Sequence, residues 1–172
     1  MPRFLPETDL NGTGYCAAFR FRMAARAVTR LFDAALQECG IRSTQFAILV
    51  AVAKKQPIAM HELSEVLFID QTTLTRSLRL MRREGLLAIS ERSTMRQRFV
   101  TVTPKGEQAL AQAVPLWRKI QERFVDGVGP KHWAELREEL SDVSKLAALM
   151  EHKEETKLSG TKRREHAVHG KT

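Results

Sequence analysis

The spacing of apolar residues changes at Gly85, and this change constrains the fold more than any other feature of the chain. Before Gly85, apolar side chains recur every three or four residues, which is the period of amphipathic helices. After it, apolar residues alternate with small or polar ones over 87–90 and again over 99–102, with a polar, basic connection between them. Two alternating segments joined in this way predict a β-hairpin. The sequence therefore predicts a mainly α-helical fold with one small β-hairpin.

Four helices are expected before the hairpin. Their predicted ranges are 14–40, 43–55, 60–67 and 71–84. Gly40 and Gly85 follow the first and the fourth, as is common just past the end of a helix. Asp70 stands at the N-cap of the fourth helix, whereas Ala59 before the third offers no capping side chain. We therefore expect the fourth helix to have the better-defined start.

Two longer helices are expected after the hairpin. The first begins at Pro104, because proline suits the first turn of a helix, and Pro115 inside it predicts a kink. The glycines and proline of 127–130 separate it from a last helix that ends near residue 151.

The helices and the hairpin together predict a single domain over 14–151. Residues 1–13 mix prolines, a glycine and polar residues, and we expect a flexible arm there. Residues 152–172 have almost no apolar side chains, so this segment is expected to be a disordered basic tail.

The charge of the chain is positive and clustered. Lys and Arg number 28 against 20 Asp and Glu, a net charge of +8. Residues 71–98 contain seven arginines and two glutamates, so five of the eight net charges fall in this one stretch. Clustered positive charge favours nucleic acid as the partner, because it attracts the phosphate backbone.

Several other classes of protein are disfavoured. No apolar run approaches the roughly 20 residues that span a bilayer, and no apolar segment follows Arg3 as it would in a secretory signal. We therefore expect a cytoplasmic, nucleoid-associated protein. The five histidines and two cysteines do not group with a nucleophile or at metal-ligand spacing, and there is no glycine-rich phosphate loop. We expect no enzyme, no cofactor and no metal.

The helix over 71–84 has two contrasting faces. Leu74, Leu78 and Met81 share one face and are expected in the core. Arginine on the other face can bridge guanine O6 and N7, and threonine can contact a thymine methyl group. In the hairpin, arginine suits a narrow minor groove. The predicted DNA contacts are Gln71, Thr72, Thr73, Thr75, Arg76, Arg79 and Arg83 in the helix, and Arg96 and Arg98 in the hairpin.

Over about residues 14–150 the chain resembles the MarR family of bacterial transcription regulators. The matching motifs are Thr44-Gln45-Phe46, Glu62-Leu63, Asp70-x-x-Thr73-Leu74-Thr75-Arg76, Gly85-Leu86 and Thr103-x-Lys105-Gly106. Two positions depart from the family pattern. Thr94 stands where an aspartate commonly braces the arginine two residues on, and Ile89 stands where an arginine is often found. Wing contacts therefore fall to Arg96 or Arg98.

The resemblance implies a winged helix-turn-helix fold and a homodimer. The helices over 14–40 and 104–151 would form the dimer, and 41–103 would form the DNA-binding lobe. The helix over 71–84 would enter the major groove and the wing over 91–98 the minor groove of a pseudo-palindromic operator. The expected action is repression, relieved by an effector.

Two triggers for release are compatible with the sequence. Arg22, Arg26 and Arg30 recur at four-residue spacing and are candidates to line a pocket for a small aromatic or anionic effector. The alternative is thiol oxidation at Cys16, which lies near a helix N-terminus where a thiol pKa falls. Alignment with the peroxide-sensing branch of the family, however, puts Ala18 at the reactive position. Cys39 is expected to be passive.

Two further alternatives keep the fold and change the partner. A DNA-coating protein without sequence preference would use the same basic helix, aided by the tail. A winged helix that binds another protein predicts a neutral or acidic helix face, which this chain lacks.

Overall fold

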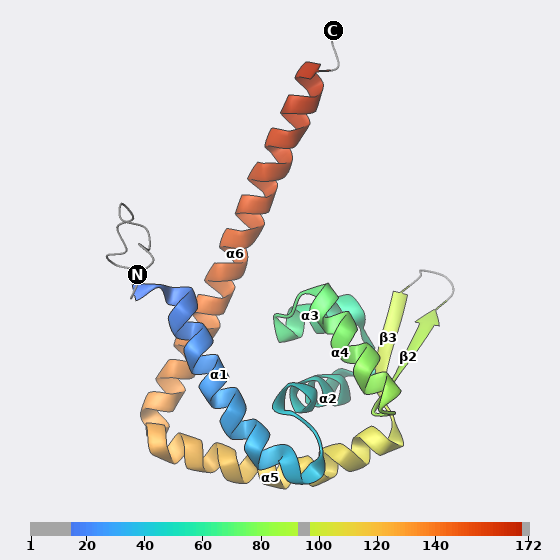
Figure 1. Cartoon of the computed structure of the whole chain (residues 1–172), viewed down its shortest axis with the longest axis vertical. Helices are drawn as coiled ribbons and strands as arrows, with labels where there is room; N and C mark the ends of the chain where they lie inside the picture. The colour runs from blue at the N-terminus through green and yellow to red at the C-terminus, as the bar shows by residue number, and fades with distance from the viewer. Residues whose placement is uncertain (1–14, 93–96, 170–172) are drawn as a thin grey trace, which may run out of the picture. The chain divides into compact units, whose positions relative to one another are not determined.

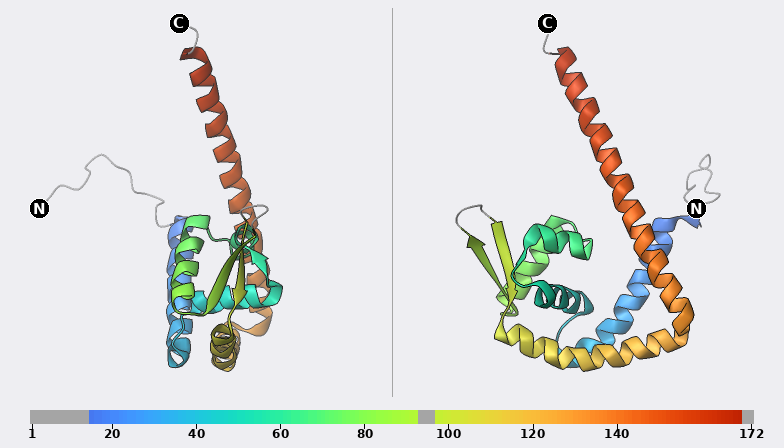
Figure 2. Two further views of the ribbon diagram at one scale, coloured as in Figure 1. Left: turned by 90° about the vertical axis from the view of Figure 1, so that its right-hand side faces the viewer. Right: turned by 180° about the vertical axis from the view of Figure 1, so that it is seen from behind.

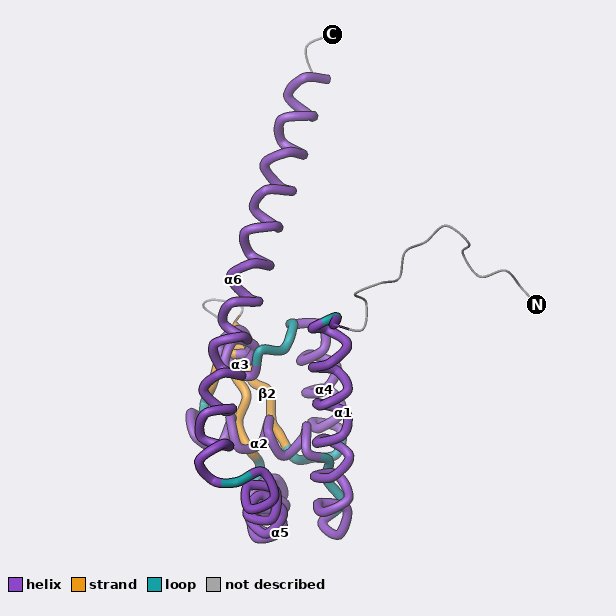
Figure 3. The backbone as a smooth tube through the Cα atoms, turned by 90° about the vertical axis from the view of Figure 1, so that its left-hand side faces the viewer, coloured by secondary structure: helices purple, strands orange, loops and turns teal. Residues whose placement is uncertain are grey.

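The computed structural model describes residues 15–92 and 97–169, and the side chains of these ranges apart from 91, 92, 152 and 154–169. The elements are α1 (Ala17–Leu36), a short 3-10 helix η2 (Gln37–Cys39), α2 (Ser43–Lys55), β1 (Ile58–Ala59), α3 (Met60–Leu67), α4 (Gln71–Arg83), β2 (Leu87–Arg92), β3 (Gln97–Val102), α5 (Pro104–Val128) and α6 (Pro130–His169). Helices make up most of the described chain, and the strands are confined to one small sheet (Figure 3). The predicted fold class is confirmed.

The sheet has three antiparallel strands in the order β1-β3-β2. The predicted hairpin is confirmed as β2 and β3, in which Leu87 pairs with Val102 and Ile89 with Val100. The sequence analysis did not include β1, which pairs Ile58 with Val100. Two residues are too few to display the alternation that identifies a strand. The hairpin extends away from the helices of the lobe (Figure 2).

The core forms where α2, α3, α4 and the sheet meet, and Figure 1 shows these elements gathered into one lobe. The fully buried side chains that fill it are Leu36, Ile48, Leu49, Val52, Ile58, Leu63, Leu74, Leu78, Met81, Leu87 and Val100. The three residues of α4 in this set are those that the helical period predicted. Each buried leucine side chain contributes about 1.5–3 kcal/mol relative to exposure, so α4 is anchored along its whole length.

The base of the hairpin is fastened to the start of α5. The Thr103 hydroxyl donates a hydrogen bond to the Gly85 carbonyl at 2.6 Å and accepts one from the Gly106 amide at 3.1 Å. Gly106 packs against the Leu86 carbonyl so closely that a Cβ atom would overlap it. The glycine is therefore required for this contact between α5 and the base of the wing.

The chain divides into two units, residues 1–121 and 122–172, and each is described by itself. In the second unit, Gly129 with φ of +95° separates α5 from α6. The rings of Phe124 and Trp133 meet edge to face across this break, with centroids 5.4 Å apart. Aromatic pairs with this geometry stabilise beyond the area they bury, so the contact fixes the turn.

α5 is one helix that continues through Pro115, as predicted. Helical structure extends further than expected at the C-terminal end of the described chain. α6 continues to His169, although the sequence analysis predicted disorder from residue 152. That prediction rested on the lack of apolar residues, which limits burial but not local helix formation, since Lys, Glu and Ala favour helices. No helix in the described part of the chain is both long and apolar enough to cross a membrane.

Candidate nucleic-acid interface

The start of α4 is capped as predicted. The Asp70 carboxylate accepts a hydrogen bond from the Thr73 amide at 2.8 Å. Hydrogen bonds from the Thr73 hydroxyl and then from its amide lower the Asp70 pKa below the ordinary value of 3.8. The Thr72 amide contributes to the same lowering of the pKa, so the Asp70 carboxylate caps the first turn of α4.

The face of α4 opposite the core is exposed and basic. The exposed residues on it are Thr72, Thr73, Arg76, Arg79 and Arg83, and Gln71 is exposed at the N-terminal end. Thr75, also a predicted contact, is half-buried. Its hydroxyl donates to the Gln71 carbonyl at 2.6 Å, which leaves only acceptor capacity on that oxygen.

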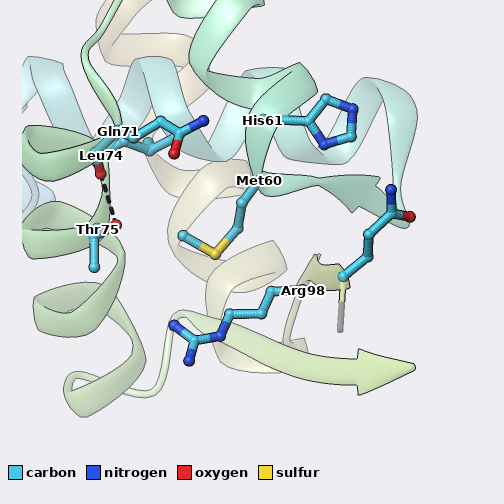
Figure 4. A pocket seen from close by; sticks show the side chains of 7 residues that line it. Met60, His61, Gln71, Leu74, Thr75 and Arg98 are labelled. Atoms are coloured by element: carbon cyan, nitrogen blue, oxygen red, sulfur yellow. Dashed lines mark hydrogen bonds between the residues drawn. The ribbon is translucent and has the colours of Figure 1, made fainter. Parts of the chain in front are cut away.

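A groove runs between α4 and the wing. Its first section has a volume of about 310 Å³ and is lined by Met60, His61, Gln71, Leu74, Thr75, Gln97 and Arg98 (Figure 4). A second section of about 370 Å³ adds Arg79, Arg82 and Ile89. The groove therefore brings Arg98 of β3 together with Gln71, Thr75 and Arg79 of α4, all four of them predicted DNA contacts. Such juxtaposition of a helix and a wing can follow two neighbouring grooves of a duplex.

Three polar residues of this groove were absent from the predicted contacts, namely Gln97, Arg82 and His61. Arg82 was counted in the charge of the segment, but its position on the helix lies at the edge of the arginine face, and the wing brings it into the site. His61 at the start of α3 was interpreted as an exposed histidine without a role, and it is exposed. The fold places His61 in the lining of the same groove as Gln71 of α4 and Arg98 of the wing.

The other flank of α4 carries a second basic groove. It has a volume of about 520 Å³ and is lined by Arg76, Arg79, Leu80, Arg82 and Arg83. Four guanidinium groups on one helix surface attract anions and present donors in the fork geometry that suits phosphate and base edges. Of the two predicted wing contacts, Arg98 is exposed on β3, whereas Arg96 lies outside the described residues.

The arginines predicted to line an effector pocket lie on α1. Arg22, Arg26 and Arg30 are all exposed, and they do not line an apolar pocket that opens on the surface of the first unit. That pocket has a volume of about 390 Å³ and is lined by Phe32, Ser43, Phe46, Ala47, Val50, Ala51, Lys54, Val66, Leu67 and Trp117. The stacked rings of Phe46 and Trp117, 5.7 Å apart, form part of its wall.

The cysteines are both free thiols. Cys16 is exposed at the N-cap position of α1, and Cys39 is half-buried with its Sγ donating to the Leu36 carbonyl at 3.1 Å. Among the residues described, no group of three or more His, Cys, Asp and Glu side chains gathers in a way that would hold a metal ion.

Known proteins resemble this chain most clearly over the lobe. A model of the MarR family matches residues 40–97. The transcriptional regulator HosA of Escherichia coli is 33% identical over 82 residues, which cover 47% of this chain and 61% of HosA. The matched part of the chain thus spans less than two thirds of that curated relative.

The similarity to solved structures covers more of the chain. The M. tuberculosis transcriptional regulator MosR, solved in complex with DNA, is 35% identical, with a TM-score of 0.71 over 77% of this chain and 96% of MosR. Bordetella bronchiseptica BpsR, whose DNA binding is regulated by 6-hydroxynicotinic acid, is 22% identical with a TM-score of 0.66 over 75% of this chain and 93% of BpsR. BpsR shares the fold. These relatives are regulators and not enzymes.

Proposed function

This chain belongs to the MarR family of transcription regulators, and from that premise we propose that it binds a specific sequence of double-stranded DNA. The observation that carries the proposal is the construction of α4. One face is anchored in the core by Leu74, Leu78 and Met81, all fully buried, and the opposite face is exposed and rich in arginine. A helix held in this way presents its base-reading side chains at a fixed geometry. The solved complex of MosR with DNA supports the assignment.

Each group in the site has a role in this proposal. Arg76 and Arg79 reach guanine edges in the major groove, where a bidentate pair discriminates between bases by about 1–3 kcal/mol. Gln71 pairs with an adenine edge, and Thr72 and Thr73 contact the bases or the backbone near the N-terminal end of α4. Arg98 follows the minor groove from the wing, together with Arg96.

The active species in this proposal is a homodimer. α1 leaves Phe19 and Leu31 exposed by 55% and 41%, and α6 leaves Leu146 and Leu149 exposed by 57% and 61%. Apolar side chains gathered on two long helices are typical of a surface that another chain covers, and a second copy is the partner that the family resemblance implies. A two-fold dimer would read two half-sites about 34 Å apart in a pseudo-palindromic operator at the nucleoid.

We further propose repression that a small aromatic anion relieves. The support is the pocket beside Phe46 and Trp117, which has apolar walls and one cationic lining residue, Lys54. Pockets of this composition bind aromatic ligands, with a few polar groups to fix their orientation. Arg22, Arg26 and Arg30 remain the alternative anion site.

Fluorescence anisotropy tests the DNA proposal directly. Duplex from upstream of the protein's own gene is compared with a shuffled duplex over a range of salt. A preference of roughly 10³ that persists at higher salt is expected of a specific regulator. Equal binding that fades with salt would indicate either the wrong operator or a DNA coat, and selection from random duplexes separates these two. Absence of all DNA binding would contradict the proposal and favour a protein-binding winged helix.

A further inference from the structure

The first turn of α2 is capped by a side chain from α1. The N-cap residue of α2, Arg42, has no side-chain cap bond. The Asp33 carboxylate of α1 takes this role: its Oδ1 accepts hydrogen bonds from the Ser43 amide at 2.7 Å and from the Ser43 hydroxyl at 2.6 Å. A carboxylate at a helix N-terminus is favoured by the helix dipole and by the unpaired amides there. The end of α1 and the start of α2 are therefore joined through polar groups.

Gln45 connects this same turn to the far end of α4. Its Oε1 accepts a hydrogen bond from the Arg42 amide at 2.8 Å, and its Nε2 donates one to Glu84 Oε2 at 2.7 Å. Gln45 and Glu84 are half-buried and lie 39 residues apart in sequence. The amide oxygen of Gln45 thus bonds the N-cap residue of α2, and its amide nitrogen bonds the C-cap residue of α4.

Glu84 is the C-cap residue of α4 and is held on two further sides. Its amide donates to the Leu80 carbonyl at 3.0 Å, and its carbonyl accepts from the Lys105 ammonium of α5 at 2.8 Å. Arg83, a predicted DNA contact, is its immediate neighbour. Two side chains therefore hold the C-terminal end of α4. Gln45 of α2 donates to the Glu84 carboxylate, and Lys105 of α5 donates to the Glu84 carbonyl.

We propose that Gln45 and Glu84 are positioning residues for the DNA interface, linking α1 through Asp33 and Ser43 to the end of the helix that reads the bases. This inference rests on the proposed function. Discrimination between bases requires donor positions held to within about 0.5 Å. Loss of the Gln45–Glu84 bond removes the side-chain tie between α2 and the end of α4 next to Arg83, and leaves that end held by Lys105 and by the buried face of the helix. The expected result of breaking the link is loss of discrimination rather than loss of folding.

Exchanging the amide and the carboxylate between positions 45 and 84 tests the hydrogen bond between them at constant net charge. Gln45→Glu places a second carboxylate against Glu84 and breaks the bond. Glu84→Gln keeps it, because an amide oxygen accepts from Gln45 Nε2 as a carboxylate does. The two substitutions together restore the bond with donor and acceptor reversed, and the net charge equals that of the wild type.

The measurement is the ratio of Kd values for a shuffled duplex and for the duplex that the wild-type protein selects from a random pool. Gln45→Glu is expected to lower this ratio at least about twofold, the lower end for close neighbours in one hydrogen-bond network, while Glu84→Gln and the double variant stay near the wild type. Ala111→Glu is the charge control, because it adds the same charge at an exposed position on α5 that does not line the pocket beside Glu84 and Lys105. A ratio unchanged by Gln45→Glu, not rescued in the double variant, or lowered equally by Ala111→Glu overturns the inference.

Two further measurements distinguish the effect of the Gln45–Glu84 bond on base discrimination from a general loss of stability and from a failure of the proposed DNA binding. Circular dichroism at the temperature of the binding assay must show all variants fully folded, because a merely structural role would lower the melting temperature and leave the ratio of Kd values unchanged. Amide hydrogen exchange over 78–86 reports the link without DNA: we expect faster exchange in Gln45→Glu and wild-type exchange in the double variant. If the wild-type protein selects no duplex, the proposed function fails and the DNA role of the link falls with it, while exchange still shows whether the bond holds α4.

Discussion

Two helices of this protein carry a line of three arginines, and one of them is anchored along its length whereas the other is anchored at its C-terminal end. The arginines are Arg76, Arg79 and Arg83 in α4 and Arg22, Arg26 and Arg30 in α1. α4 buries three side chains completely on its opposite face, whereas α1 buries one, Leu36 at its C-terminal end, in the part of the chain that the structure describes. An arginine pattern in the sequence therefore has different consequences according to how the other face of the helix is anchored.

This difference in anchoring distinguishes a surface that can recognise a ligand in the single chain, that of α4, from one whose apolar side chains are still exposed, that of α1. The arginines of α4 project from a helix whose position the core determines, so their spacing can match a fixed ligand such as a duplex. The apolar side chains of α1, among them Phe19 and Met23 at 55% and 50% exposure, are not covered by the described part of the chain. In the proposed homodimer a second copy covers them, and this contrast between α4 and α1 can be tested.

The largest expected effect is on stability. Leu78→Ala in α4 removes a fully buried side chain and is expected to lower the free energy of unfolding by about 2–5 kcal/mol. Leu31→Ala in α1, at 41% exposure, is expected to cost under about 1 kcal/mol in the monomer. Urea denaturation at low protein concentration measures both. If the loss of unfolding free energy in Leu31→Ala grows with protein concentration, a dimer through α1 is supported. Equal losses for Leu31→Ala and Leu78→Ala in dilute protein would contradict the difference in anchoring between α1 and α4.

The next effect concerns DNA. Arg76→Ala is expected to weaken binding to the selected duplex by about 1–3 kcal/mol and to relax the preference at one base position. Arg26→Ala removes the same charge from α1 and is expected to leave that preference intact. Anisotropy with a set of single-base variants of the duplex gives the comparison. Uniform weakening on every sequence would reassign Arg76 to a phosphate contact.

The smallest effect concerns the starts of the two helices. Asp70 caps α4, whereas Cys16 at the same position of α1 makes no side-chain cap bond. Asp70→Ala is therefore expected to lower the melting temperature at pH 7, and Cys16→Ala to leave it unchanged. Because folding lowers the Asp70 pKa from 3.8, the carboxylate stabilises the fold above that pH, and this contribution is lost as the pH falls through the lowered value.

Thermal unfolding followed by circular dichroism at pH 7 and near pH 2 checks that sign. The difference between the wild type and Asp70→Ala is expected to shrink at the lower pH. A difference that grew on acidification would show that the carboxylate does not stabilise α4 in its charged form.

Local features of the sequence were sufficient to predict α4 and the hairpin. The period of Leu74, Leu78 and Met81 identified the buried face, the chemistry of Asp70 located the first residue, and the alternation after Gly85 marked the strands. Each of these signals lies within a few residues of the structure it determines. Helix ends and strand pairs of this kind can be predicted from a single sequence.

Features that depend on distant residues were not predicted. β1 exists because Ile58 pairs with Val100, and Thr75 is half-buried because the wing packs beside it. The bond from Gln45 to Glu84 joins two elements 39 residues apart, and no period or spacing signals it. The interface contacts assigned to Arg76, Arg79 and Arg98 stay predictions until DNA binding is measured.

The cap that α1 provides for α2 has a consequence for the order in which the chain is made. Asp33 precedes Ser43 by ten residues, so it has already been synthesised when the first turn of α2 leaves the ribosome. A helix is costly to nucleate, and α2 meets its capping carboxylate at once. Gln45 must wait for Glu84, 39 residues later, a delay of about 2–8 s at ordinary rates of synthesis. The capping carboxylate of α2 is thus present in the growing chain before Glu84, the residue that links α2 to α4, has been made.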